Sequence, residues 1–117
     1  MTITKGSPNF PPDVFGPSLW FVIHITALRL PEFPTSADKK HFVSFYESLQ
    51  HVLPCDGCRI GYKKMLESTK FGTKDVKNRD TLFAWTVKIH NMVNARLGKN
   101  VNNSATFWKR KYMELSN

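Results

Sequence analysis

The stretch SADKKHFVSFYESLQHVL, residues 36–53, carries apolar side chains at the spacing of an α-helix. The apolar positions recur at i, i+3, i+4, i+7, i+10 and i+11, and they are Phe42, Phe45, Tyr46, Leu49, Val52 and Leu53. Such a stripe predicts an amphipathic helix with one face on a core. Pro54 ends this helix, because proline has no N–H to donate and disfavours the helical conformation of the residue before it.

A first helix is predicted before this stretch, from about Ser18 to Leu30. Residues 16–18, Gly-Pro-Ser, open it, because proline is tolerated in the first turn of a helix. Its side chains are apolar almost all round, which suits a bundle centre or a subunit interface. Residues 1–13 are expected to form a flexible lead, and residues 14–117 a single domain.

Three more helices are predicted after Pro54. One starts within residues 55–58 and ends near residue 68, and a longer one runs from an N-cap at Asp80 to Leu97, with Gly98 just past its end. Ser104 caps a shorter fifth helix. The core stripe of the longer helix comprises Leu82, Phe83, Val87, Ile89, Val93 and Leu97. With no credible pair of strands, the pattern predicts an all-α, up-and-down four-helix bundle with a short fifth helix.

The chain is basic, with 17 Lys and Arg against 9 Asp and Glu and a formal charge of +8. This charge is compatible with a nucleic-acid partner, an anionic ligand or a solvated basic surface. The basic residues are dispersed over several predicted helices without an aromatic–basic repeat. A basic nucleic-acid-binding module is therefore the rival of a different class, and we expect no nucleic acid as partner.

No targeting or membrane segment is predicted. The first 12 residues lack the apolar centre of a secretory signal. The most apolar stretch, residues 19–30, is too short to span a bilayer and is interrupted by His24, Thr26 and Arg29. We therefore expect a soluble protein without a secretory address.

The two cysteines of the chain stand together as Cys55-Asp56-Gly57-Cys58. Because a helix is predicted to begin inside this motif, its unpaired N–H groups and its dipole would stabilise a thiolate. A low thiol pKa makes thiol–disulfide exchange faster at neutral pH. Three other interpretations stay open: a thioredoxin-like pair, a buried inert pair, and a zinc site. The zinc site would need two ligands from His24, His41, His51 and His90.

A second polar segment, HNMVNARLGK, occupies residues 90–99 at the end of the predicted fourth helix. Asparagine is a poor helix former and is rarely buried without a partner. A bound polar ligand therefore explains Asn91 and Asn94 better than solvent does. His24 and His90 could also be core histidines whose ring nitrogens are hydrogen-bonded within the protein.

Together these motifs resemble the Erv/ALR family of FAD-linked sulfhydryl oxidases. The segment GPSLWFVIHITA, residues 16–27, is similar to the family pattern G-x-x-x-W-x-x-x-H-x-x-A. Residues 53–58, LPCDGC, are similar to Y-P-C-x-x-C, and Trp85 with residues 90–99 is similar to W-x-x-x-x-H-N-x-V-N-x-x-L-G-K. The chain departs from the pattern at Leu53, where tyrosine is usual, and at Pro17, where arginine is common.

The resemblance implies FAD at the mouth of the bundle and no metal. The residues that would hold FAD are Gly16, Trp20 and His24 on the first helix, Tyr46 on the second, and His90, Asn91, Val93, Asn94, Leu97 and Lys99 on the fourth, with Trp108 or Tyr112 closing the adenine end. Lys99 is also a sensible partner for a pyrophosphate because of its charge.

The resemblance further implies a disulfide relay. A substrate dithiol would attack Cys55, Cys58 would lie beside the flavin, and molecular oxygen would be reduced to hydrogen peroxide. The partners implied are a protein dithiol substrate or a separate thiol carrier, since the chain has no further cysteines, and a second copy that packs through the first helix. The small size is most similar to viral members, which implies host cytoplasm or virion, with the mitochondrial intermembrane space as the alternative.

Overall fold

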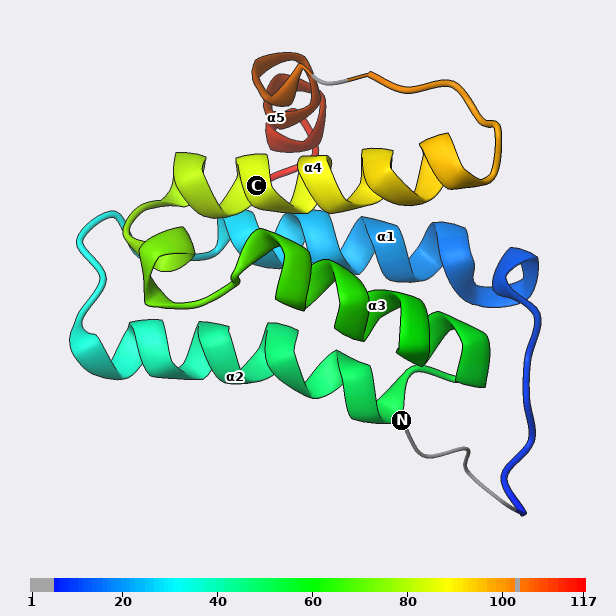
Figure 1. Ribbon diagram of the computed structural model, residues 1–117. Coiled ribbons are helices and arrows are strands. Elements are labelled where there is room, and N and C mark those ends of the chain that lie inside the picture. The colour runs from blue at the N-terminus through cyan, green and yellow to red at the C-terminus, as the bar shows by residue number, and fades with distance from the viewer. Residues whose placement is uncertain (1–5, 103) are drawn as a thin grey trace.

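The computed structural model describes residues 6–102 and 104–117 and contains five α-helices and one 3-10 turn in that part of the chain (Figure 1). The elements are α1 (Pro12–Leu28), α2 (Ser36–Val52), α3 (Asp56–Thr69), η1 (Thr73–Val76), α4 (Arg79–Arg96) and α5 (Ala105–Met113). No strand occurs in the described residues, so the predicted all-helical class is confirmed. Residues 1–5 of the expected lead lie outside the described residues.

The four longer helices form the bundle, with α1 packed on α4 and α2 packed on α3. Figure 1 shows these four helices side by side and α5 placed on the outer side of α4, where it is seen almost end-on. After α4, residues 97–102, which we call the linker, lead back along α4 toward α5 (Figure 1). α1, α4 and α5 therefore meet along one side of the bundle.

The bounds of α2 agree with the prediction, and local capping chemistry sets its start. The Thr35 hydroxyl accepts a hydrogen bond from the Asp38 N–H at 3.0 Å, and the Asp38 carboxylate accepts one from the Thr35 N–H at 2.9 Å. This reciprocal pair is a capping box, which satisfies two N–H groups at the start of the helix. The helix ends at Val52, two residues before Pro54.

Two predicted helix starts are wrong. α1 begins at Pro12 rather than near Ser18, because a proline in the first turn gives up no helical hydrogen bond. Pro17, expected to mark the first turn, lies inside α1 instead. α4 begins at Arg79 with Asn78 as its cap rather than Asp80, since the Asn78 side-chain oxygen accepts from the Thr81 N–H at 2.8 Å.

Two other helix-end signals are confirmed. Gly98 follows α4 with a φ of +73°, a left-handed conformation that glycine adopts without strain. The Ser104 hydroxyl accepts from the Phe107 N–H at 3.2 Å and caps α5. By contrast, Leu97 was predicted in the core stripe of α4 but is 54% exposed, because the helix has ended there.

Tyr46 on α2 joins three helices in the core. Its side chain is fully buried, and its hydroxyl donates to the main-chain oxygen of Ile23 on α1 at 2.8 Å. The hydroxyl of Tyr62 on α3 donates to the main-chain oxygen of Tyr46 at 2.5 Å. Burying a hydroxyl group without a hydrogen-bond partner would destabilise the fold, and these two hydrogen bonds supply the partners. Tyr46 therefore sets the spacing of α1, α2 and α3.

None of the helices in residues 6–102 and 104–117 has both the length and the apolar character needed to cross a membrane.

Candidate active site

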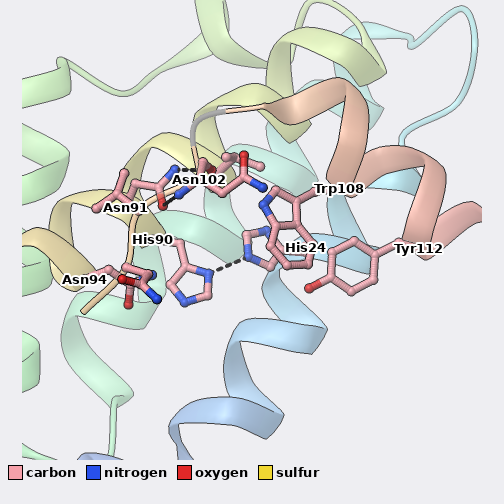
Figure 2. Close-up of a pocket in the computed structure, with 10 residues that line it drawn as sticks. His24, His90, Asn91, Asn94, Asn102, Trp108 and Tyr112 are labelled. Atoms are coloured by element: carbon pink, nitrogen blue, oxygen red, sulfur yellow. Dashed lines mark hydrogen bonds between the residues drawn. The ribbon is translucent and has the colours of Figure 1, made fainter.

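Histidine, asparagine and aromatic side chains line a cavity of about 170 Å³ between α1, α4, α5 and the linker (Figure 2). We call this the polar cavity. Six of its lining residues were predicted as site residues: His24, His90, Asn91, Asn94, Trp108 and Tyr112. Trp108 and Tyr112 both project from α5, one turn apart, so the short fifth helix closes this side of the cavity.

A buried chain of hydrogen bonds connects α1 to α4 at the base of the polar cavity. The Thr86 hydroxyl donates to the Phe83 main-chain oxygen at 2.7 Å. Its oxygen is therefore the acceptor in the 2.9 Å contact with His24 Nδ1, and His24 Nδ1 carries the proton. His24 Nε2 must then accept the hydrogen bond from His90 Nδ1, also at 2.9 Å (Figure 2). The network thus assigns a tautomer to each ring.

Both histidines are held neutral near physiological pH. Burial, followed by the charge that His90 would carry, lowers the pKa of His24 from 6.5 to about 3. The pKa of His90 is also lowered, by burial first and then by the positive charge of Lys99. A neutral His90 that donates through Nδ1 leaves the lone pair of Nε2 available as an acceptor.

Asn91 has a structural role in this region. Its side-chain N–H₂ donates to the Asn102 main-chain oxygen at 2.6 Å, and its side-chain oxygen accepts from the Asn102 N–H at 3.2 Å. These two bonds hold the linker beside α4 and explain why a buried asparagine is tolerated. The half-buried Asn94 differs, since its side-chain amide makes no hydrogen bond to any residue that the structure describes.

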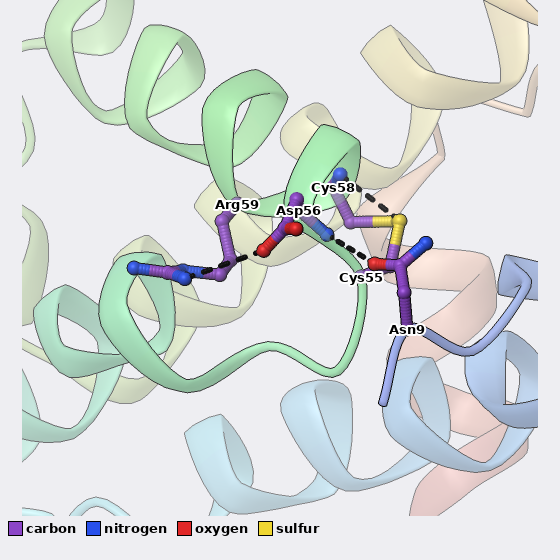
Figure 3. Close-up of a disulfide and its surroundings, with 5 residues drawn as sticks. All are labelled: Asn9, Cys55, Asp56, Cys58 and Arg59. Atoms are coloured by element: carbon purple, nitrogen blue, oxygen red, sulfur yellow. Dashed lines mark hydrogen bonds and ion pairs between the residues drawn. A yellow bond between two sulfur atoms is a disulfide. The ribbon is translucent and has the colours of Figure 1, made fainter. Parts of the chain in front are cut away.

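Cys55 and Cys58 form a disulfide (Figure 3). The pair lies at the N-terminus of α3, which is the position predicted from the sequence. Cys55 is the N-cap residue, and the Cys58 N–H donates to Cys55 Sγ at 3.2 Å. After reduction, this N–H and the helix dipole would favour a thiolate at Cys55. Within the described residues no three His, Cys, Asp or Glu side chains cluster as metal ligands would.

Cys58 lines a second cavity, of about 130 Å³, which is mainly apolar and which we call the thiol cavity. Four predicted site residues from α1 and the end of α4 share it with Cys58: Gly16, Trp20, Val93 and Leu97. Trp20 stacks on His90 with ring centroids 4.1 Å apart and an angle of 6° between the planes. Because Trp20 faces the thiol cavity and His90 the polar cavity, this stacked pair lies between the two.

Two predicted site residues lie elsewhere. Tyr46 is in the core, bonded to Ile23, and lines neither cavity. Lys99 is exposed and also lines neither cavity, although its charge acts on His90. Thr86, which the sequence analysis missed, is fully buried in the hydrogen-bond chain. The available signal was its position one helical turn before His90, which places both side chains on one face of the helix.

Comparison with known proteins gives consistent matches. Residues 17–113 match the family described as Erv1 / Alr. The chain is 38% identical over 88 residues to a protein of Acanthamoeba polyphaga mimivirus named as a probable FAD-linked sulfhydryl oxidase, covering 75% of this chain. It is 33% identical over 115 residues to the mitochondrial FAD-linked sulfhydryl oxidase of Schizosaccharomyces pombe, covering 94% of this chain. The chain spans 62% of the length of each relative.

The fold matches a solved structure as well. The crystal structure of the yeast Erv1 core superposes with a TM-score of 0.81 at 26% sequence identity. The match covers 99% of this chain and 94% of the other. The arrangement of α1–α5 is therefore shared along nearly the whole length.

The hydrogen-bond chain predicts distinct effects of two substitutions at Thr86. Thr86→Val keeps the shape but removes the hydroxyl, so the buried N–H of His24 loses its acceptor and the free energy of unfolding falls by about 1–3 kcal/mol. Nitrogen NMR of the imidazole rings should then show His24 leaving the Nδ1–H tautomer. Thr86→Ser keeps the hydroxyl and should retain the tautomer. An unchanged tautomer and stability in Thr86→Val would contradict the assignment.

The low pKa of His24 predicts that stability falls in mild acid. The folded-state pKa, about 3, lies below the ordinary 6.5, so the unfolded chain binds the extra proton and stability decreases as pH drops through this window. Urea unfolding at about pH 7 and about pH 5.5 should differ by roughly 1 kcal/mol because of this residue. In His24→Gln, the difference in the free energy of unfolding between the two pH values should be smaller by roughly 1 kcal/mol. An equal pH dependence in both proteins would show that His24 does not titrate this way.

Proposed function

The chain belongs to the Erv1/Alr family, and from this membership we propose that it is an FAD-dependent thiol oxidase. It would form disulfide bonds in protein substrates and pass the electrons through FAD to molecular oxygen, giving hydrogen peroxide. The observation that carries the proposal is the position of Cys58, which belongs to a disulfide and at the same time lines a cavity that adjoins the polar cavity.

The residues of the two cavities fit a flavin dinucleotide. Flat aromatic rings suited to stacking on flavin or adenine come from α1, α4 and α5: Trp20, His90, Trp108 and Tyr112. The polar cavity offers His90 Nε2 and the Asn94 amide, for which the described part of the chain supplies no hydrogen-bond partner. Gly16 leaves space beside the thiol cavity, since a Cβ built there would contact nothing within 4 Å.

Lys99 and Tyr46, which the family resemblance implies for FAD binding, line neither cavity, so the proposal gives each of them a less direct role. Lys99, exposed beside His90, would reach a pyrophosphate by its flexible chain and its charge. Tyr46 would support the site from the core, through its hydrogen bond to Ile23 on α1. When bound, FAD would supply the two-electron acceptor and the reaction with oxygen.

The cysteine pair would perform two exchange steps. A substrate thiolate attacks Cys55 Sγ, which breaks the Cys55–Cys58 bond, forms a mixed disulfide and releases Cys58 as a thiolate. A second substrate thiol loses its proton and attacks the substrate sulfur of the mixed disulfide, which releases Cys55. The substrate has then lost two electrons and two protons, and the reduced cysteine pair holds the two electrons beside the thiol cavity.

The assignment of Cys58 as the sulfur next to the cofactor is supported by its position on the thiol cavity. The assignment of Cys55 as the attacked sulfur follows from that of Cys58, since the other sulfur of the pair is the one left for the substrate. The hydrogen bond from the Cys58 N–H to Cys55 Sγ favours the second step, in which Cys55 is released as a thiolate.

We also propose the partners and the location. The Cys55–Cys58 pair would take electrons directly from protein dithiols or from a separate thiol carrier. The likeness to a mimivirus protein supports a viral origin, with action in the host cytoplasm or the virion. The likeness to a mitochondrial protein keeps the intermembrane space as the alternative.

A homodimer through α1 is part of the proposal. Val14, Phe21 and Val22 are 67%, 40% and 44% exposed on this helix, at spacings that place them on neighbouring faces. Apolar side chains exposed on one helix are typical of a surface that another molecule covers.

Oxygen uptake tests the proposed activity. The protein loaded with FAD should consume oxygen and release hydrogen peroxide when a reduced dithiol peptide is added. Cys58→Ser should lower this rate by at least about 100-fold while FAD stays bound, because the exchange pair is lost and the cavities are retained. Absence of thiol-dependent oxygen uptake by the FAD-loaded unmutated protein would refute the activity.

Sedimentation tests the proposed dimer. At micromolar concentration the protein should sediment as a dimer, and Val22→Glu should shift it to monomer because a charge would be buried at the interface. Val52→Glu, on an exposed residue at the end of α2, serves as the matched control and should leave the dimer intact. A monomer in the unmutated chain at this concentration would show that the proposal is wrong.

A further inference from the structure

Residues 9 and 10 run alongside the disulfide and bond to the main chain on both sides of Cys55. The Phe10 N–H donates to the Pro54 main-chain oxygen at 2.8 Å. The Asn9 side-chain oxygen accepts from the Asp56 N–H at 2.7 Å (Figure 3). Cys55 is consequently flanked by two hydrogen bonds to a segment 45 or more residues away, and it is only 8% exposed.

The burial of Cys55 conflicts with its proposed role. A substrate thiolate must approach Cys55 Sγ closely to form the mixed disulfide. Cys58 lines the thiol cavity and is half-buried. Because residues 9 and 10 hydrogen-bond to the main chain on both sides of Cys55, a peptide that approaches Cys55 along this side has to displace them.

The described contacts that join the segment to residues 54 and 56 are polar. Phe10 is 48% exposed, so about half of its surface still faces water. One of the two hydrogen bonds uses the main chain of the segment, and the other uses a simple amide oxygen, which any peptide bond also offers. Pro11 stands before another proline, which favours an extended backbone, and it has a φ of −69° and a ψ of 147°. An extended peptide of another sequence could make the same two bonds.

We propose that the Pro54 oxygen and the Asp56 N–H form a docking edge for an extended substrate peptide, and that residues 9 and 10 occupy this edge in the resting protein. The peptide would donate a main-chain N–H to Pro54 and accept from Asp56 through a main-chain oxygen, which brings its cysteine next to Cys55. Recognition by main-chain hydrogen bonds selects extended segments and tolerates many sequences. This inference rests on the proposed thiol oxidase function.

The chemical step at the edge is the first exchange step. The peptide thiolate attacks Cys55 Sγ, one S–S bond forms between peptide and Cys55, the Cys55–Cys58 bond breaks, and Cys58 leaves as a thiolate. With a peptide that has a single cysteine the reaction stops at the mixed disulfide, so no electrons need to reach FAD or oxygen.

The experiment measures how fast a single-cysteine peptide forms this mixed disulfide without oxygen, using alkylation of the released Cys58 and mass spectrometry. Asn9→Ala/Phe10→Pro removes the acceptor and the N–H together, and the rate should rise by about 10-fold. Asn9→Asp/Phe10→Ala is the matched control, since it changes both side chains but keeps an acceptor and an N–H. Its rate should stay within about 2-fold of the unmutated chain.

A second peptide, N-methylated at the residues beside its cysteine, tests the docking edge itself. It should react at least about 5-fold more slowly than the unmodified peptide with the Asn9→Ala/Phe10→Pro protein, because it lacks the N–H for Pro54. Equal rates for the two peptides, or no acceleration in that variant, would overturn the proposal. This rate measurement needs neither FAD nor oxygen, so it tests the docking edge separately from the oxidase activity. If mixed-disulfide formation is faster in the variant but the FAD-loaded protein shows no thiol-dependent oxygen uptake, the docking edge is supported and the proposed oxidase function is refuted.

Discussion

The hydrogen bonds of His24 hold α1 against α4, and the arrangement of the site depends on them. The neutral ring donates to Thr86 through Nδ1 and accepts from His90 through Nε2. Burial lowers the pKa of His24 and so keeps the ring in this neutral form. The same contact orients His90, which stacks on Trp20 between the two cavities.

This geometry divides the site into regions of different chemistry. The thiol cavity is mainly apolar and contains Cys58, whereas the polar cavity contains histidine, asparagine and tyrosine groups that suit a nucleotide. The disulfide lies at the N-terminus of α3, where helix N–H groups favour a thiolate once it is reduced. In the proposed reaction, substrate would enter from the side of residues 9 and 10, and electrons would leave through Cys58 toward the cofactor.

Features set by local chemistry could be predicted from the sequence. The limits of α2, the turn at Gly98, the cap at Ser104 and the helix start at the cysteine pair all depend on residues within one turn. Local signals failed where two residues competed for one role. Asn78 and Asp80 could both cap α4, and Pro12 and Pro17 could both stand in the first turn of α1.

Contacts between distant segments were beyond prediction from one sequence. Thr86 meets His24 across 62 positions, and Asn9 meets Asp56 across 47, with no pattern that links them. Tyr46 has the spacing of the core stripe and also the aromatic ring of a cofactor residue, and its bond to Ile23 on α1 could not be foreseen from either feature. Asn91, predicted as a cofactor-binding residue, lines the polar cavity, and its amide also holds the main chain of Asn102, a contact that no sequence pattern indicated.

The most direct test of the central claim, that the two cavities hold FAD beside the disulfide, is the visible absorption spectrum of the purified protein before and after denaturation. We expect a yellow protein that releases about one FAD per chain. A colourless protein that cannot be reconstituted with FAD would contradict it.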